Sequence, residues 1–176
     1  MIHGLRFLLV TAATFLLCLS LHELGHAIAG CITGGMITEI AIFSLPPHVR
    51  IAGDAGTAGE MFRSAGGSGF FLLLYFVACI IVRPWNVVSR QVREMASWFA
   101  AIEVGGWVLA SMVKPDAFGP NDAERFLAVS GMHPASLAAV CVFIGAAGAL
   151  ALYAARERRP FQPVEAPPLT RHAAAG

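Results

Sequence analysis

Apolar residues in this chain of 176 gather into four long stretches, separated by short segments that hold most of the charges. The stretches cover about residues 5–29, 66–82, 95–113 and 134–155. A helix needs about 20 mostly apolar residues to cross roughly 30 Å of hydrocarbon. Each stretch meets or approaches that length, so the pattern predicts four transmembrane helices.

The segment between the first two stretches has a different pattern. Residues 36–43 carry β-branched side chains in partial alternation, and a proline pair at residues 46–47 ends that run. Residues 48–52 resume the pattern briefly, which predicts a second short strand. Glycines between residues 53 and 59 then indicate a loop. The predicted fold is an all-α membrane protein with a short β segment after its first helix.

Composition and charge agree with a membrane protein. Hydrophobic residues make up 57% of the chain and charged residues 13%, whereas a soluble domain is roughly a quarter charged. A net charge of +1 provides no global field for an anionic partner, which excludes a nucleic-acid-binding module. We expect residues 1–159 to form one domain in the lipid bilayer and the proline-containing residues 160–176 to be disordered. The sequence leaves the oligomeric state open.

A secretory signal peptide is an alternative interpretation of the first stretch. Arg6 precedes the apolar run, and the residues at 27–29 (Ala-Ile-Ala) resemble a cleavage site. The apolar stretch is too long for a signal peptide, however, and two histidines and a glutamate beside the supposed cut have no place in one. The sequence therefore favours a helix that is retained.

The first stretch contains an HExxH motif at residues 22–26. On a helix, His22 and His26 lie one turn apart on the same face, so both imidazoles can reach one metal ion. Zinc lowers the pKa of coordinated water to about 7, and Glu23 is placed to take a proton from it. Ionisable residues in a transmembrane segment are costly, and three within five residues indicate a functional site. The alternative is a polar helix end without a metal.

A catalytic zinc ion takes three protein ligands and keeps one position open. If the four helices cross the bilayer in turn, residues 114–134 lie on the same side as the motif. That segment holds Asp116, Asp122, Glu124 and His133. Asp122 stands just before the helix-like residues 123–130, so it is either the third ligand or the cap of that helix. Asn121 is an alternative cap.

Two further features of the stretches have alternative roles. Glu103, within the third stretch, is another possible third ligand, a group that orients one imidazole, or the partner of an arginine. Gly66, Gly67, Ser68 and Gly69 open the second stretch. Small residues let helix backbones approach closely in lipid, which favours packing against the motif helix. A backbone contact to substrate is the other reading of these four residues.

The sequence resembles the site-2 protease family of intramembrane zinc metalloproteases, in particular its small members that lack a PDZ domain. The resemblance is carried by HELGHAIAG at residues 22–30 with a glycine pair at 34–35, by the glycine-rich residues 65–69, and by NDAERFLAVSGMHP at residues 121–134 before an apolar helix. It extends over most of the chain to about residue 155. The Asn-x-x-Pro…Leu-Asp-Gly motif of the larger members is missing.

The resemblance implies a specific site and activity. His22 and His26 would bind zinc, Asp122 would complete the ligand set, and Glu23 would be the general base. The substrates of the family are membrane-spanning protein segments cleaved in or near the bilayer. In that picture residues 36–43 would offer a strand edge to an extended substrate.

The sequence therefore predicts a zinc-dependent endopeptidase with a membrane protein as substrate. The alternative is a non-catalytic metal-binding membrane protein, such as an inactive relative, a scaffold or a metal carrier.

The distribution of basic residues predicts the orientation in the membrane. Eight basic residues lie near the termini and the loop after the second stretch, against four on the motif side: Arg50, Arg63, Lys114 and Arg125. The positive-inside rule then favours cytosolic termini in a multi-pass membrane protein.

Overall fold

The computed structural model describes residues 2–44, 47–81, 87–112 and 121–157, which form mostly helix. The four long helices are α1 (Ile2–Ile32), α2 (Gly56–Ile81), α3 (Val87–Met112) and α5 (Pro134–Glu157). Each of them is long and apolar enough to cross a membrane. The prediction of four membrane-spanning helices is confirmed on length and composition. The tail predicted at residues 160–176 lies outside the described residues.

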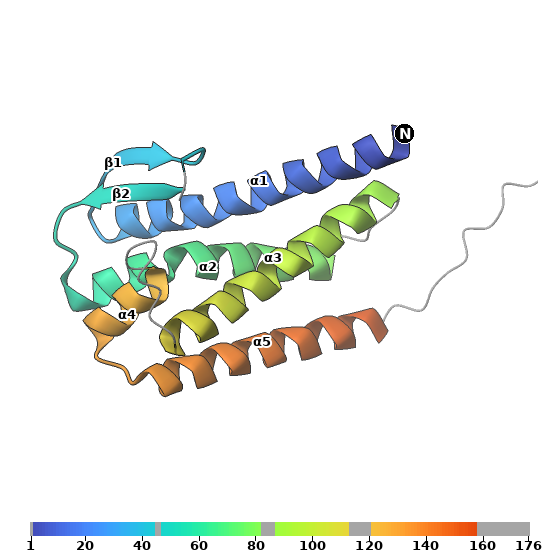
Figure 1. Cartoon of the computed structure of the whole chain (residues 1–176). Coiled ribbons are helices and arrows are strands. Elements are labelled where there is room, and N and C mark those ends of the chain that lie inside the picture. Colours follow the sequence, from blue (N-terminus) through green and yellow to red (C-terminus); the bar gives the residue numbers. More distant parts are fainter. Residues whose placement is uncertain (1, 45–46, 82–86, 113–120, 158–176) are drawn as a thin grey trace, which may run out of the picture.

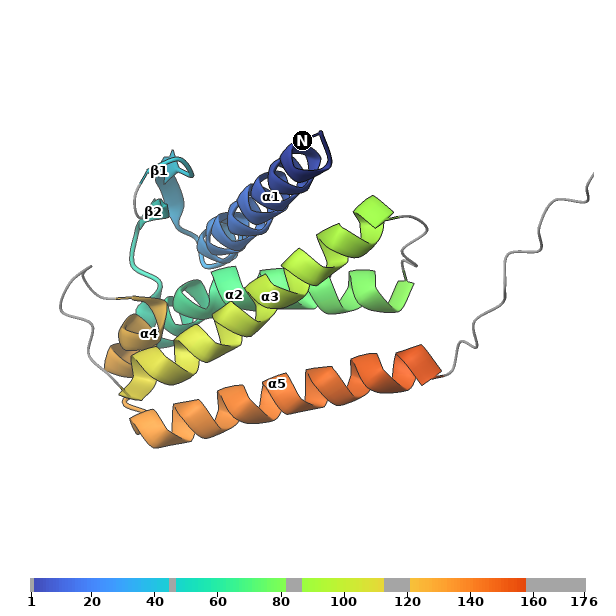
Figure 2. The ribbon, with the colours of Figure 1, turned by 45° about the vertical axis from the view of Figure 1, so that its right-hand side comes forward.

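Successive long helices run in opposite directions (Figure 1). The C-terminal end of α1, the start of α2, the end of α3 and the start of α5 therefore lie at one end of the bundle. The N-terminus and the end of α5 lie at the other. Figures 1 and 2 both place α2 and α3 between α1 and α5. The HExxH motif is thus near the same end of the bundle as the start of α5.

Large apolar side chains cover the outside of the bundle. Leu9, Phe143 and Leu150 are 60%, 73% and 69% exposed, and many others resemble them. Apolar surface of this extent is rare on soluble monomers, whereas lipid tails cover it without cost. The buried core is small and includes Cys18 and Phe71. The surface therefore agrees with a multi-pass membrane protein.

The β segment is an antiparallel hairpin beside the C-terminal end of α1 (Figure 1). Strand β1 (Met36–Ala41) pairs with β2 (His48–Ala52), and the register shifts by one residue between Ile37 and Glu39. Gly34 makes the turn out of α1 with a φ of 75°, a conformation that suits glycine. Both predicted strands are confirmed, although β1 ends at Ala41 rather than residue 43.

Two helices begin earlier than predicted. Helix α2 starts at Gly56 rather than residue 66, so the predicted loop over residues 53–63 is mostly helix. The Asp54 carboxylate accepts a hydrogen bond from the Gly56 backbone N–H (2.8 Å), which satisfies one free donor of the first turn. Helix α3 starts at Val87 rather than residue 95. Both added segments are more polar than the apolar stretches on which the prediction rested.

A short helix, α4 (Asp122–Ser130), lies between α3 and α5 in the sequence. Gly131 ends it with a φ of 65° and donates its N–H to the Leu127 carbonyl oxygen. The helix packs against α2 and α3: Ala123 is 2% exposed, and the Phe126 ring meets the Trp107 ring edge-on at 5.7 Å between centroids. This packing holds the first turn of α4 beside the HExxH motif.

Candidate metal centre

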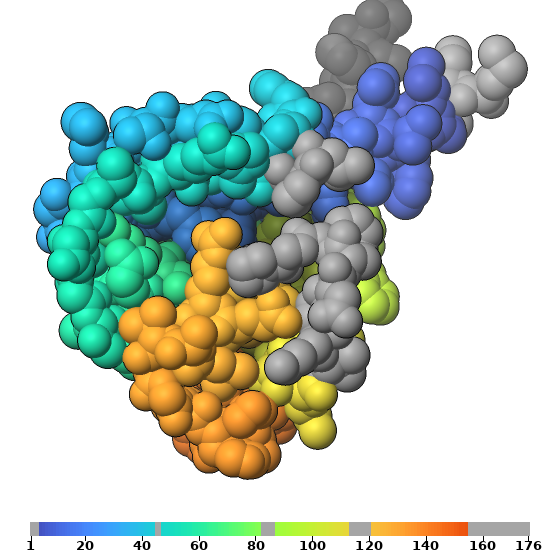
Figure 3. All heavy atoms as spheres, turned by 60° about the vertical axis from the view of Figure 1, so that its left-hand side comes forward, coloured from blue at the N-terminus to red at the C-terminus, as the bar shows by residue number. Residues whose placement is uncertain are grey.

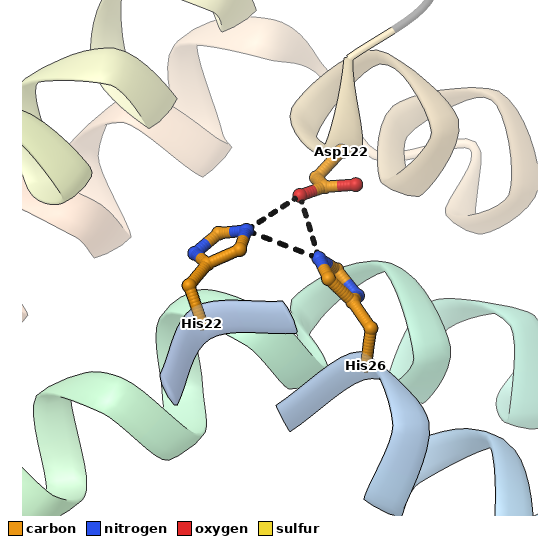
Figure 4. A group of neighbouring side chains, drawn as sticks. All are labelled: His22, His26 and Asp122. Carbon is orange, nitrogen blue, oxygen red and sulfur yellow. Dashed lines mark hydrogen bonds and ion pairs between the residues drawn. The ribbon is translucent and has the colours of Figure 1, made fainter. Parts of the chain in front are cut away.

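The motif histidines turn the same ring nitrogen toward one point (Figure 4). His22 and His26 lie one turn apart on α1, and their Nε2 atoms are 3.1 Å apart. Both side chains are nearly buried, at 13% and 12% exposure. The helical spacing predicted from the sequence therefore places two nitrogen donors side by side inside the bundle.

Asp122, the first residue of α4, completes the cluster from the opposite side (Figure 4). Its Oδ2 atom lies 3.0 Å from His26 Nε2 and 3.5 Å from His22 Nε2. Asn121 caps the helix instead: its side chain accepts from the Glu124 N–H, and the Glu124 carboxylate accepts from the Asn121 N–H. Because a neighbouring residue supplies the cap, the Asp122 carboxylate is free to face the histidines.

The environment keeps Asp122 ionised. Burial raises the pKa of a carboxyl group, but in Asp122 the hydrogen bonds with His22 and His26 outweigh it and hold the pKa below the usual range. An ionised carboxylate is the form that binds a metal ion. The cluster thus brings one carboxylate oxygen to two ring nitrogens, which can act as ligands once their Nε2 protons are released.

The spacing of the three donor atoms fits a zinc ion. Ligand atoms about 2.0–2.1 Å from a tetrahedral ion lie roughly 3.3–3.4 Å from one another. The three separations in the cluster are 3.0, 3.1 and 3.5 Å. Two imidazoles and one carboxylate are also a donor set that zinc accepts with a fourth position open. The residues present therefore fit a zinc site with three protein ligands.

The second nitrogen of each ring lies beside an acceptor. His26 Nδ1 lies 2.8 Å from the backbone carbonyl oxygen of Arg63, which can only accept, so the proton is on Nδ1. His22 Nδ1 lies 3.1 Å from Glu103 Oε1, an ion-pair contact rather than an aligned hydrogen bond. On the other side of the rings, the two Nε2 atoms and a carboxylate oxygen converge. A positive charge must sit among them, either as protons or as a metal ion.

The glycines of residues 66–69 lie against the motif helix. A Cβ on Gly67 would come within 2.5 Å of His26 Nε2 and 2.7 Å of His22 Nε2, so any side chain there would occupy the centre itself. A Cβ on Gly66 would meet Ala29 Cβ at 2.6 Å, which is a close approach of α1 and α2. By contrast, a Cβ on Gly69 would have nothing within 4 Å. Gly67 is therefore required for space at the cluster.

A cleft of about 950 Å³ leads to the cluster from the hairpin side. Figure 3 shows the hollow bordered by the hairpin, α2 and α4, with α1 at its floor. Glu23, which is 5% exposed, lines this cleft together with both histidines and Asp122. The strand that lines it is β2, through His48, Val49 and Ile51, rather than the predicted β1. The cleft is thus open to a chain lying beside β2.

Glu103 lies behind the cluster and not in it. Its Oε1 is beside Nδ1 of His22, on the opposite side of the ring from the Nε2 atom that faces Asp122. Its other oxygen accepts a hydrogen bond from the Ser68 hydroxyl. These contacts correspond to the predicted alternative of a group that orients an imidazole. The contacts of Glu103 are with His22 and Ser68 rather than with an arginine.

The remaining candidates from the segment before α5 lie elsewhere. Asp116 is outside the described residues. Glu124 belongs to the capping box of α4. His133 is exposed and accepts from the Ala135 N–H at 3.2 Å, so it starts α5 and does not reach the cluster. Among the acidic residues and the histidine of that segment that the structure describes, Asp122 is the one that lies close to the two motif histidines.

Arg63 has a role that the sequence did not reveal. It is 7% exposed, and its backbone oxygen holds His26. Its guanidinium donates to the Thr33 hydroxyl, the Gly53 carbonyl oxygen and the Glu60 carboxylate, each at 2.8 Å. Since Arg63 was assigned to a loop, it counted only as a surface charge. An arginine within a membrane helix is the signal that would have marked it.

Trp107 was also missed, and its indole N–H donates to Ser68 at 2.8 Å. Tryptophan in an apolar stretch is ordinary, so nothing in the pattern distinguishes it.

Comparisons with known proteins identify no relative of the chain: neither the family models, nor the curated proteins, nor the solved structures contain a match to it.

Proposed function

We propose that this protein is an intramembrane zinc metalloendopeptidase that cleaves membrane-spanning or membrane-proximal segments of other proteins. The observation that carries the proposal is the convergence of His22 Nε2, His26 Nε2 and Asp122 Oδ2 within 3.5 Å, beside Glu23 in an open cleft. The resemblance of the sequence to small site-2 proteases supports the same assignment.

Each residue of the centre has a defined part in this proposal. His22, His26 and Asp122 would hold the ion. Bound zinc supplies a Lewis acid that polarises a carbonyl and lowers the pKa of water to about 7. Glu23 would take one proton from the attacking water and deliver it to the amine nitrogen as the peptide C–N bond breaks. The products would be a new carboxylate and a new amine.

The hairpin supports a polypeptide as the substrate. Among the described residues β1 is the one strand paired with β2, so the outer edge of β2 has no partner strand. An extended chain can add to such an edge through main-chain hydrogen bonds. Because β2 also lines the cleft, a substrate bound there would pass close to Glu23.

The alternative, a metal-binding membrane protein without catalysis, is separated from this proposal by Glu23→Gln. We expect the variant to keep zinc and to lose cleavage of a single-span test substrate in reconstituted vesicles. Equal cleavage by the variant and the unaltered protein would refute the assigned role of Glu23. Zinc binding without cleavage in both would favour the non-catalytic alternative.

A further inference from the structure

A chain of polar contacts connects Trp107, near the C-terminal end of α3, to the rear of His22: two hydrogen bonds followed by an ion-pair contact. Trp107 Nε1 lies 2.8 Å from Ser68 Oγ, Ser68 Oγ contacts Glu103 Oε2, and Glu103 Oε1 lies 3.1 Å from His22 Nδ1. The four residues come from α1, α2 and α3. Ser68 is 5% exposed, and the Glu103 side chain is 11% exposed. The network therefore lies inside the bundle, where each polar group needs a partner.

The chemistry of the end groups sets the direction of the two hydrogen bonds. An indole N–H has no acceptor function, so Trp107 donates to Ser68. The Ser68 hydroxyl, having accepted that bond, is free to turn its own proton to Glu103. With one carboxylate oxygen held by Ser68, the other lies 3.1 Å from Nδ1 of His22. The opposite nitrogen of that ring, Nε2, faces Asp122 and His26.

The two histidines are held by acceptors of unlike kind. His26 is held by a main-chain oxygen of Arg63, which carries no formal charge. His22 faces a carboxylate, whose charge favours a ring with its Nδ1 turned toward it. A carboxylate is also costly inside a membrane helix. Because Glu103 lies against Nδ1 of His22, a proposed metal ligand, a role at the metal centre explains why a carboxylate is present there.

We propose that Glu103 is a positioning residue of the metal centre, supported by Ser68 and Trp107, that fixes His22 as a nitrogen ligand. This inference rests on the zinc site proposed above, although it requires no assumption about peptide cleavage. Residues that orient a metal-binding histidine typically contribute about 10- to 100-fold to metal affinity. The same range is expected for Glu103.

The test measures zinc affinity by competition with a chelator, using the full-length chain in detergent. Glu103→Ala is expected to lower affinity about 10- to 100-fold. Glu103→Gln, whose amide oxygen can still accept from Nδ1, should recover part of that loss, because orientation is kept and charge is not. Ser68→Ala and Trp107→Phe should lower affinity less, in the same direction.

Tyr75→Phe is the matched control. The Tyr75 hydroxyl and the Ser97 hydroxyl lie 2.7 Å apart and also join α2 to α3, but neither contacts the cluster. This variant should bind zinc as the unaltered protein does. A cobalt-substituted sample adds a second readout, since Glu103→Ala should shift the visible bands of cobalt and Tyr75→Phe should not.

The outcomes separate this inference from the proposed function. If Asp122→Ala loses zinc while Glu103→Ala, Glu103→Gln and Ser68→Ala all keep full affinity and an unchanged cobalt spectrum, the positioning role is wrong and the metal site stands. If Asp122→Ala also keeps full affinity, the metal site itself is wrong. Should Glu103→Ala fail to fold, Glu103→Gln and Ser68→Ala decide the question alone.

Discussion

The two ends of the helical bundle are held together by different interactions. At the end with the hairpin, charged and polar groups connect separate elements: His26 to Arg63, Arg63 to Gly53, and Glu103 to Ser68. Toward the opposite end, α1 and α3 are joined by uncharged groups: Gln91 donates to the Phe7 carbonyl oxygen at 2.9 Å and to the Thr11 hydroxyl at 3.1 Å, and the Phe15 ring packs edge-on against Phe99. Polar groups in a membrane are costly, so their concentration at one end indicates where function is.

This comparison separates the expected effects of substitutions. Changes at the hairpin end should alter metal binding, with or without a change in stability. Changes toward the opposite end of the bundle should alter stability and leave metal binding intact.

Asp122→Ala should have the largest effect. It removes the one anionic donor of the cluster, and we expect zinc content to fall from about one ion per chain to near zero, because two imidazoles alone make an incomplete site. Elemental analysis of the purified protein measures this. Glu39→Gln, which changes a carboxylate paired with Arg50 on the hairpin, is the control and should retain zinc. Equal zinc in the Asp122 variant would contradict the ligand assignment.

Gly67→Ala should come next. Its Cβ would lie 2.5 Å from His26 Nε2, so the backbone or the rings must move apart. Overpacking of this kind costs about 1–3 kcal/mol, which corresponds to a loss of about 5- to 150-fold in zinc affinity. Gly69→Ala, in the same segment with open space around it, should bind zinc normally. Chelator competition on both variants tests the pair, and equal affinities would show that the cluster is looser than described.

Arg63→Ala should mainly weaken the packing of the hairpin against the helices. It removes the hydrogen bonds to the Gly53 carbonyl oxygen and the Thr33 hydroxyl, each worth about 0.5–1.5 kcal/mol where water can replace the lost donor. The backbone oxygen that holds His26 remains, so zinc affinity should fall less than in Gly67→Ala. Hydrogen exchange of residues 36–52 measures this weakening. Arg50→Ala, whose side chain is 69% exposed, should leave exchange nearly unchanged.

Tyr75→Phe should have the smallest effect. It removes one hydrogen bond with Ser97, worth about 0.5–1.5 kcal/mol of stability. Thermal unfolding in detergent should show a small decrease while zinc affinity stays the same. A change in zinc affinity would mean that the contact between Tyr75 and Ser97 is coupled to the metal centre, contrary to the comparison.

Much of the fold could be predicted from the sequence because lipid imposes a simple rule. Long apolar stretches predict spanning helices, and the strict 3.6-residue period of a helix places His22 beside His26. Alternating helix directions placed residues 114–134 on the side of the motif, but spacing alone left Asp122 open between ligand and cap, and the resemblance to site-2 proteases favoured the ligand. The release of Asp122 from the capping role followed from Asn121, which the sequence offered only as an alternative.

What could not be predicted depends on contacts between distant segments. The start of α2 at Gly56 was missed because its first turns are glycine-rich and polar, and tertiary contacts of Arg63 compensate for weak helix propensity. The partner of Glu103 remained open because hydrophobic pattern does not specify which face of α3 meets α1. That β2 lines the cleft depends on the direction in which the hairpin folds back.

The most direct test of the account is the coordination of the bound ion, measured by X-ray absorption at the zinc edge on the full-length protein. The account predicts two imidazole nitrogens at about 2.0–2.1 Å and carboxylate or water oxygen at about 2.0–2.2 Å. In Asp122→Ala, that spectrum should be lost. A sulfur shell at about 2.3 Å, which would assign the ion to cysteines, or a spectrum unchanged in the variant would contradict it.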